Sequence, residues 1–225
     1  MLFLTGVSSL ASQATTIIFQ STSAPQTQPA PQGQAILDEQ YVGVQFATTG
    51  PAVVTSLTVD LAAGFQGGTL FGALIQLAGP DALPSNVPGD PFGNSTVLAT
   101  ALFDVGVPSE LRVPLSASLE YPGDYAVVFG AGLFGSPANA EGFAVNHGPI
   151  PECCRELLLW WDKSGASSPA NATWTRFLVD SPVPQLRNIP KVIVEGRVVP
   201  ELSSVAFFAS GLSFLLLMAV LRKRS

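Results

Sequence analysis

A single histidine, three tryptophans and one oxygen-rich loop are the features of this 225-residue chain that could do chemistry. His147 would have to be the base of any Ser-His-Asp or Cys-His arrangement, because the chain has no other histidine. It stands between Asn146 and Gly148, as in a surface loop, and no Gly-x-Ser-x-Gly nucleophile elbow occurs. The sequence therefore predicts that the protein is not an enzyme.

A surface hydrolase is a weaker alternative. The acidic pair that glycoside hydrolysis needs would have to lie about 5–10 Å apart in a cleft. The acids that come into question have the sequence context of ordinary strand-end and turn residues. They are Asp60, Asp104, Glu120, Asp124 and Asp162.

Trp160 and Trp161 end an apolar stretch, and Trp174 follows closely. Neighbouring residues of a strand point to opposite faces, so one of Trp160 and Trp161 should enter the core and the other should face solvent or a partner. An exposed ring could stack on a sugar, which makes these three tryptophans the candidate ligand platform. The favoured interpretation is nevertheless one core tryptophan and one edge or lid residue.

Residues 80–94 (PDALPSNVPGDPFGN) carry the oxygen-bearing side chains of Asp81, Asn86, Asp90 and Asn94. Oxygen ligands suit Ca²⁺, which often stiffens loops of extracellular domains, but the ligand order of an EF-hand is missing. Because Asp and Asn commonly serve backbone geometry in turns, we favour a turn. No cofactor is predicted, with a structural calcium ion as the alternative.

Cys153 and Cys154 are the only cysteines, and they are adjacent. An exported protein could join them in a strained vicinal disulfide, although two partly buried thiols are the simpler interpretation. No second Cys or His pair is present, so no metal site is predicted.

Short strands must position these residues. Residues 54–61 alternate, with Leu57, Val59 and Leu61 on one face, whereas residues 70–77 are continuously apolar, as in a strand buried on both faces. Gly, Pro, Asn and Asp separate the segments, which predicts an all-β fold over residues 35–198, an antiparallel β-sandwich or jelly roll. The expected strands are 42–47, 54–61, 70–77, 96–105, 110–115, 124–129, 142–146, 156–161, 173–179 and 191–198.

The two ends of the chain have the character of export and anchoring segments. Residues 1–14 are predicted to be a truncated signal peptide that ends in a small-x-small site, and residues 15–34 a Pro-rich linker. Residues 203–221 lack any charge, and at 1.5 Å per residue they would extend about 28 Å, close to the thickness of the hydrocarbon core. This predicts a single C-terminal transmembrane helix, with the basic stop Arg222, Lys223 and Arg224 in the cytoplasm and the body on the far side.

The tail, residues 199–225, resembles the bacterial PEP-CTERM sorting domain, which has a Val-Pro-Glu-Pro-like motif, one transmembrane helix and a basic end. Val199, Pro200 and Glu201 match the motif, and Leu202 stands at its second proline. The resemblance implies that the tail enters the cell membrane and is processed near Pro200-Glu201 by an exosortase-type protease. The body would then reach the cell surface or extracellular matrix. If Leu202 prevents processing, the protein stays permanently anchored.

The body resembles, more loosely, the choice-of-anchor type of extracellular β domain found ahead of such tails. The resemblance starts from Phe46-Ala47-Thr48-Thr49-Gly50 and the following residues 57–61, and extends over residues 35–198. It supports the β-sandwich architecture only. For an exported protein with such a tail, we expect a structural or adhesive role within an exopolysaccharide-rich envelope. The alternative is a carbohydrate-binding module that uses an exposed tryptophan.

The charge balance argues against one class of partner. Without the three basic residues of the tail, seven Lys and Arg face sixteen Asp and Glu, a net charge of −9. Nucleic acid requires a cationic surface, so we predict that it is not a ligand.

Overall fold

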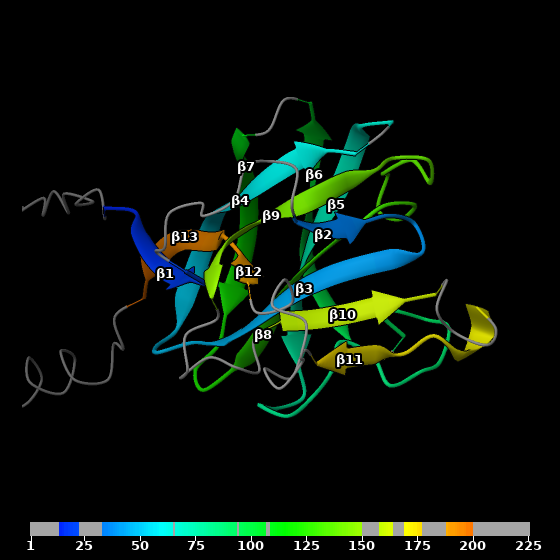
Figure 1. Ribbon diagram of the computed structural model, residues 1–225. Helices are drawn as coiled ribbons and strands as arrows, with labels where there is room; N and C mark the ends of the chain where they lie inside the picture. The colour runs from blue at the N-terminus through cyan, green and yellow to red at the C-terminus, as the bar shows by residue number, and fades with distance from the viewer. Residues whose placement is uncertain are drawn as a thin grey trace, which may run out of the picture.

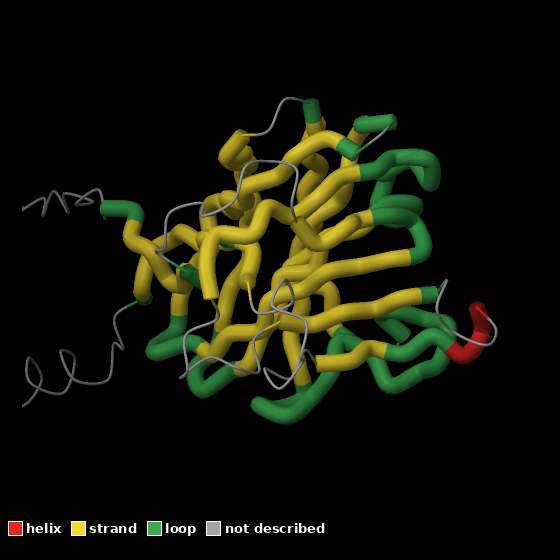
Figure 2. The backbone as a smooth tube through the Cα atoms, viewed as in Figure 1, coloured by secondary structure: helices red, strands yellow, loops and turns green. Residues whose placement is uncertain are grey.

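The structure is a computed structural model that describes residues 14–22, 33–64, 66–93, 95–106, 109–149, 158–163, 169–176 and 188–199. In these ranges the chain forms strands β1–β13 and one turn of 3-10 helix, η2 (Pro169–Asn171), which confirms the all-β prediction (Figures 1 and 2). Within them, no helix has the length and apolarity that a membrane crossing requires. The predicted span 203–221 lies outside the described residues, as do the predicted signal peptide up to residue 13 and both cysteines.

A six-stranded sheet contains most of the predicted strands in the order β11-β10-β3-β8-β5-β6. Every neighbouring pair is antiparallel. Its members are β3 (Gln40–Ala47), β5 (Gly68–Leu77), β6 (Thr96–Val105), β8 (Asp124–Gly130), β10 (Leu158–Asp162) and β11 (Trp174–Arg176).

The second sheet has seven strands and contains a fork. β4 pairs with β7 on one side, and on its other side with β13 near its start and with β9 near its end. The chain runs along β9 as β12, turns at Lys191 and continues along β4 as β13. The members are β1 (Thr16–Gln20), β2 (Gly33–Ile36), β4 (Ala52–Ala63), β7 (Ser109–Leu119), β9 (Gly142–Pro149), β12 (Asn188–Pro190) and β13 (Val192–Val198).

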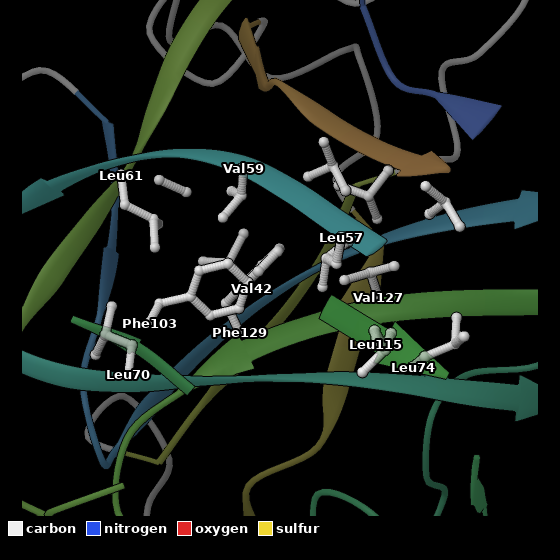
Figure 3. Close-up of a cluster of buried hydrophobic side chains, with 14 of the residues drawn as sticks. Val42, Leu57, Val59, Leu61, Leu70, Leu74, Phe103, Leu115, Val127 and Phe129 are labelled. Carbon is white, nitrogen blue, oxygen red and sulfur yellow. The ribbon is translucent and has the colours of Figure 1, made fainter. Parts of the chain in front are cut away.

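The two sheets face each other across one hydrophobic core (Figure 3). The predicted inner face of residues 54–61 is confirmed, because Leu57, Val59 and Leu61 are fully buried there. Strict alternation along residues 54–61 predicts that Val54 lies on the opposite face, with Ser56, Thr58 and Asp60, yet Val54 too belongs to this core. Relative to β13, β4 has one extra residue, Thr55, between Val54 and Ser56, and an extra residue in a strand reverses the facing of the residues beyond it.

A second hydrophobic cluster covers the outer face of the six-stranded sheet. Phe71, Ala73 and Ile75 of β5 point to this side, and Leu83 and Phe92 from the segment between β5 and β6 pack over them. Leu70 and Leu74 of the same strand point into the core between the sheets. The prediction that residues 70–77 form a strand buried on both faces is therefore confirmed.

The predicted linker 15–34 begins too early and ends too late. Residues Thr16–Gln20 form β1, which pairs with β13, and β2 starts at Gly33 and pairs with β9. These short segments, like β12, become strands because partners distant in the sequence supply their hydrogen bonds. Local composition does not contain that information.

Truncating a core leucine should destabilise the protein far more than truncating an exposed one. Leu74 is fully buried between the sheets, whereas Leu102 on the neighbouring strand is 45% exposed. We expect Leu74→Ala to lower the free energy of unfolding by about 2–5 kcal/mol, since it leaves a cavity. Leu102→Ala should change it by less than about 0.5 kcal/mol. Urea unfolding followed by circular dichroism measures both, and equal losses would contradict the assignment of the core.

Candidate functional site

Trp161 and Trp174 lie inside the second hydrophobic cluster. Trp161 is 2% exposed and its ring stacks on that of Tyr41 at 4.9 Å, and Trp174 is 3% exposed. The Trp174 indole Nε1–H donates a hydrogen bond of 2.8 Å to the carbonyl oxygen of Pro91. Both rings therefore stabilise the cover of the sheet and do not form an open platform for a sugar.

Trp160 points to the opposite face of β10 and packs, half-buried, against the core between the sheets. The predicted alternation of Trp160 and Trp161 is thus present, but neither ring is free in solvent, since Trp160 is half-buried and Trp161 is buried. The reason is the segment between β5 and β6, which folds over the outer face. A local pattern along β10 cannot reveal a cover that comes from another part of the chain.

The oxygen-rich segment is organised by hydrogen bonds of its own. The Asp90 carboxylate accepts the backbone N–H of Phe92 at 3.0 Å, the geometry of an Asx turn, and the Ser85 hydroxyl accepts that of Val87 at 3.0 Å. Asp81 instead contacts Arg176 at 3.4 Å. These bonds support the turn interpretation. No group of three or more His, Cys, Asp or Glu arranged to hold a metal occurs among the described residues, and Asn94 lies outside them.

His147 corrects the expectation of a surface loop residue. It lies on β9 and is only 6% exposed, and its Nε2 contacts Asp60 Oδ2 at 2.7 Å. β9 continues to Pro149, past the predicted end at residue 146, because β12 pairs with its second half. Asp60, which we expected to be an ordinary strand-end acid, is therefore the partner of a buried histidine at the fork.

A polar network extends from this fork across the outer face of β4. Lys191 contacts Glu110, which lies opposite Asp60 on β7. Further along β4, Glu195 Oε2 accepts a hydrogen bond of 2.7 Å from the Ser56 hydroxyl and one of 2.6 Å from the Arg112 Nε–H. The Ser56 hydrogen bond, and to a smaller degree Arg112, hold the pKa of Glu195 below its usual value against the opposing effect of burial.

Beside this network lies a shallow groove, which we call the β4–β7 groove. It consists of two hollows of about 370 and 270 Å³ that share Thr55 and Pro114 as lining residues, and Arg112 and Ser56 line the smaller one. The groove forms where the β4–β7 register shifts, and Pro114 has no N–H to donate to its neighbour. Sequence reasoning missed it, because only the pairing of β4 with β7 brings these residues together.

The predicted sorting motif begins where the described body ends. Val199 is 40% exposed, and its backbone N–H donates a hydrogen bond of 2.8 Å to the carbonyl oxygen of Pro51. Pro200, Glu201 and the basic stop Arg222–Arg224 lie outside the described residues.

Removing either partner of the His147–Asp60 pair should weaken the fork. We expect His147→Gln and Asp60→Asn each to destabilise the protein by about 1–3 kcal/mol, since a buried polar group loses its partner. The double variant should cost less than the sum of the two, with a coupling energy of at least about 0.5 kcal/mol. Urea unfolding of the four proteins measures the cycle, and strictly additive losses would show that the contact contributes nothing.

The protein should lose stability at alkaline pH through Tyr41. Burial, and secondarily the charge of Asp38, raises the pKa of Tyr41 to about 12. Between pH 10 and about 12 the unfolded chain therefore releases this proton before the folded protein does. The free energy of unfolding falls in that window, by at most about 1.4 kcal/mol per pH unit for this one group.

Tyr41→Phe provides the control, because it keeps the ring and removes the proton. Burial also raises the pKa of Tyr125, so part of the alkaline loss should remain in this variant. Urea unfolding at several values between pH 9 and 12 measures both slopes. Identical slopes for the two proteins would contradict the assignment to Tyr41.

The His147–Asp60 contact and the β4–β7 groove thus lie on the seven-stranded sheet, while the tryptophans belong to the body's hydrophobic clusters. No model of a known protein family matches the chain, and no curated protein matches it significantly.

Proposed function

We propose that this chain is an exported bacterial protein of the cell surface or extracellular matrix, sorted through its PEP-CTERM-like tail. The observation that carries the proposal is the sequence of the last 27 residues: a Val-Pro-Glu motif, an uncharged run long enough to cross a bilayer, and a tribasic end. The last described strand supports it, because β13 ends at Val198, directly before the motif starts.

The positions of the first and last described strands support a body that is attached to the membrane at one side. β1 and β13 pair with each other, so the first and last described strands lie side by side (Figure 1). A tail that continues from β13 would hold the whole body at that side. The predicted export signal and the tail would then both leave the body in the same region.

We propose that the body is a jelly-roll-like β-sandwich with a structural or adhesive role, without catalytic activity. Its two sheets share one core, and a second cluster covers the outer face of the six-stranded sheet. The tyrosines, phenylalanines and tryptophans of these clusters serve packing, which leaves the polar outer face of β4 and β7 as the surface for contacts with matrix material.

One observation favours a carbohydrate-binding module as the second candidate. The β4–β7 groove combines the ring of Pro114 with the hydroxyls of Thr55 and Ser56 and the guanidinium of Arg112. Sugars offer hydroxyls for such polar groups and C–H faces for an apolar ring. In this version the exopolysaccharide contacts the groove, and the tryptophans do not take part.

The intact mass of the protein from membrane and extracellular fractions of the native host tests the sorting proposal. We expect the extracellular form to lack the residues after about Glu201. An intact C-terminus found only in the membrane would show a plain anchor, which is the remaining alternative, and would contradict processing.

Substitution at the motif sharpens this test. Leu202→Pro completes the Val-Pro-Glu-Pro pattern and should raise the processed fraction, whereas Pro200→Ala should lower it. Leu202→Ala is the matched control for a change at the same position, and it should leave the fraction near that of the unaltered protein. If all three behave alike, the motif does not direct processing.

A further inference from the structure

Exposed apolar side chains gather at the side of the body where the tail begins. Tyr121 is 52% exposed, Val198 51% and Val199 40%. Hydrogen bonds join their segments: Val199 donates to Pro51, and the Thr48 hydroxyl donates to Glu120 at 2.9 Å. We call this surface the tail-side pole; it consists of the turns 47–51 and 120–123 and the end of β13. Ile17 on the adjacent β1 is a further exposed apolar residue, at 54%.

The turn that carries Tyr121 is held in place by the body. The Glu120 N–H donates a hydrogen bond of 2.7 Å to the Tyr125 hydroxyl oxygen, and that hydroxyl donates to the Glu120 carbonyl at 3.2 Å. Tyr125 itself is buried in the core. Tyr121 is therefore presented outward by a turn that is tied to the core, and its exposure is a property of the folded body.

Chain length limits how far this pole can lie from a membrane. Four peptide steps separate Val199 from Ser203, where the predicted span starts, and a fully extended chain covers about 14 Å in four steps. The headgroup layer on one side of a bilayer is about 5–8 Å thick. Since Val199 is hydrogen-bonded to Pro51, the pole has to lie against the headgroups or within about 6–9 Å of them whenever the span is inserted.

The chemistry of the pole suits that location. The two turns contain no Lys or Arg, and Glu120 is their one acidic residue. Tyrosine is favoured at the membrane interface, because its ring enters the apolar region while its hydroxyl stays hydrated. In water the same exposed valines and tyrosine would have unfavourable contact with solvent.

We propose that the tail-side pole docks on the lipid interface, with Tyr121 in the headgroup region and Val198 and Val199 beside it. The proposal rests on the sorting proposal above, because it requires the predicted span to be inserted. Before processing, the body then has a fixed orientation on the membrane. The loop that carries Leu133, at the other end of β8, faces away from the bilayer.

A probe at the pole tests this in the full-length chain. Cys153 and Cys154 are replaced by serine, and Tyr121→Cys is labelled with an environment-sensitive fluorophore. Leu133→Cys is the matched control, because Leu133 is an exposed apolar loop residue, at 37%. Both proteins are reconstituted in phosphatidylcholine vesicles that contain a lipid with a nitroxide in its headgroup, and circular dichroism checks that both are folded.

We expect the nitroxide lipid to quench the probe at position 121 several-fold more than the probe at position 133, with a blue shift of emission only at position 121. Equal, weak quenching in a protein that resists alkaline carbonate extraction would overturn the docking proposal and leave the membrane anchor intact. A protein that carbonate removes from the vesicles would overturn both proposals, since no span would hold the pole at the lipid.

Discussion

The burial of both faces of the six-stranded sheet is the constraint on which the rest of the structure depends. β5 contributes Leu70 and Leu74 to the core between the sheets and Phe71, Ala73 and Ile75 to the outer cluster. An apolar strand of this kind is stable only if something covers each side. The seven-stranded sheet covers one side, and the segment between β5 and β6 covers the other with Leu83 and Phe92.

This constraint decides where function can lie. Of the three tryptophans predicted as a ligand platform, Trp161 and Trp174 are part of the outer cover and are closed to solvent, and Trp160 packs half-buried against the core. Polar side chains are concentrated instead on the other sheet, around the His147–Asp60 contact and the bond between Arg112 and Glu195. Contacts with other molecules are therefore expected at the outer face of β4 and β7 and at the tail-side pole.

Much of the fold could be predicted from the sequence, because its strands have strong local signals. Residues 96–105 were placed with correct ends, and the continuous apolar run 70–77 correctly indicated burial on both faces. β1 and β12 were missed, because their pairing with β13 and β9 is a property of the folded chain and not of five or three residues.

The candidate site was harder to predict for the same reason. Asp60 and His147 are 87 residues apart, and only the pairing of β4 with β9 brings them together. The β4–β7 groove depends on a register shift opposite Pro114, which no spacing along the chain indicates. The predicted sorting motif differs from these sites, since it is a continuous segment whose order of residues is itself the signal, and it stays a prediction.

The membrane topology of the body is the most direct test of the whole account, and the lysines of the chain make it measurable. The chain has three lysines: Lys163 and Lys191 in the body and Lys223 behind the predicted span. A membrane-impermeant amine reagent is applied to intact spheroplasts, and labelled peptides are identified by mass spectrometry. We predict that Lys163 is labelled and that Lys223 is labelled only after the membrane is opened. Labelling of Lys223 in intact spheroplasts, or protection of Lys163 until lysis, would contradict an exported body held by a C-terminal span.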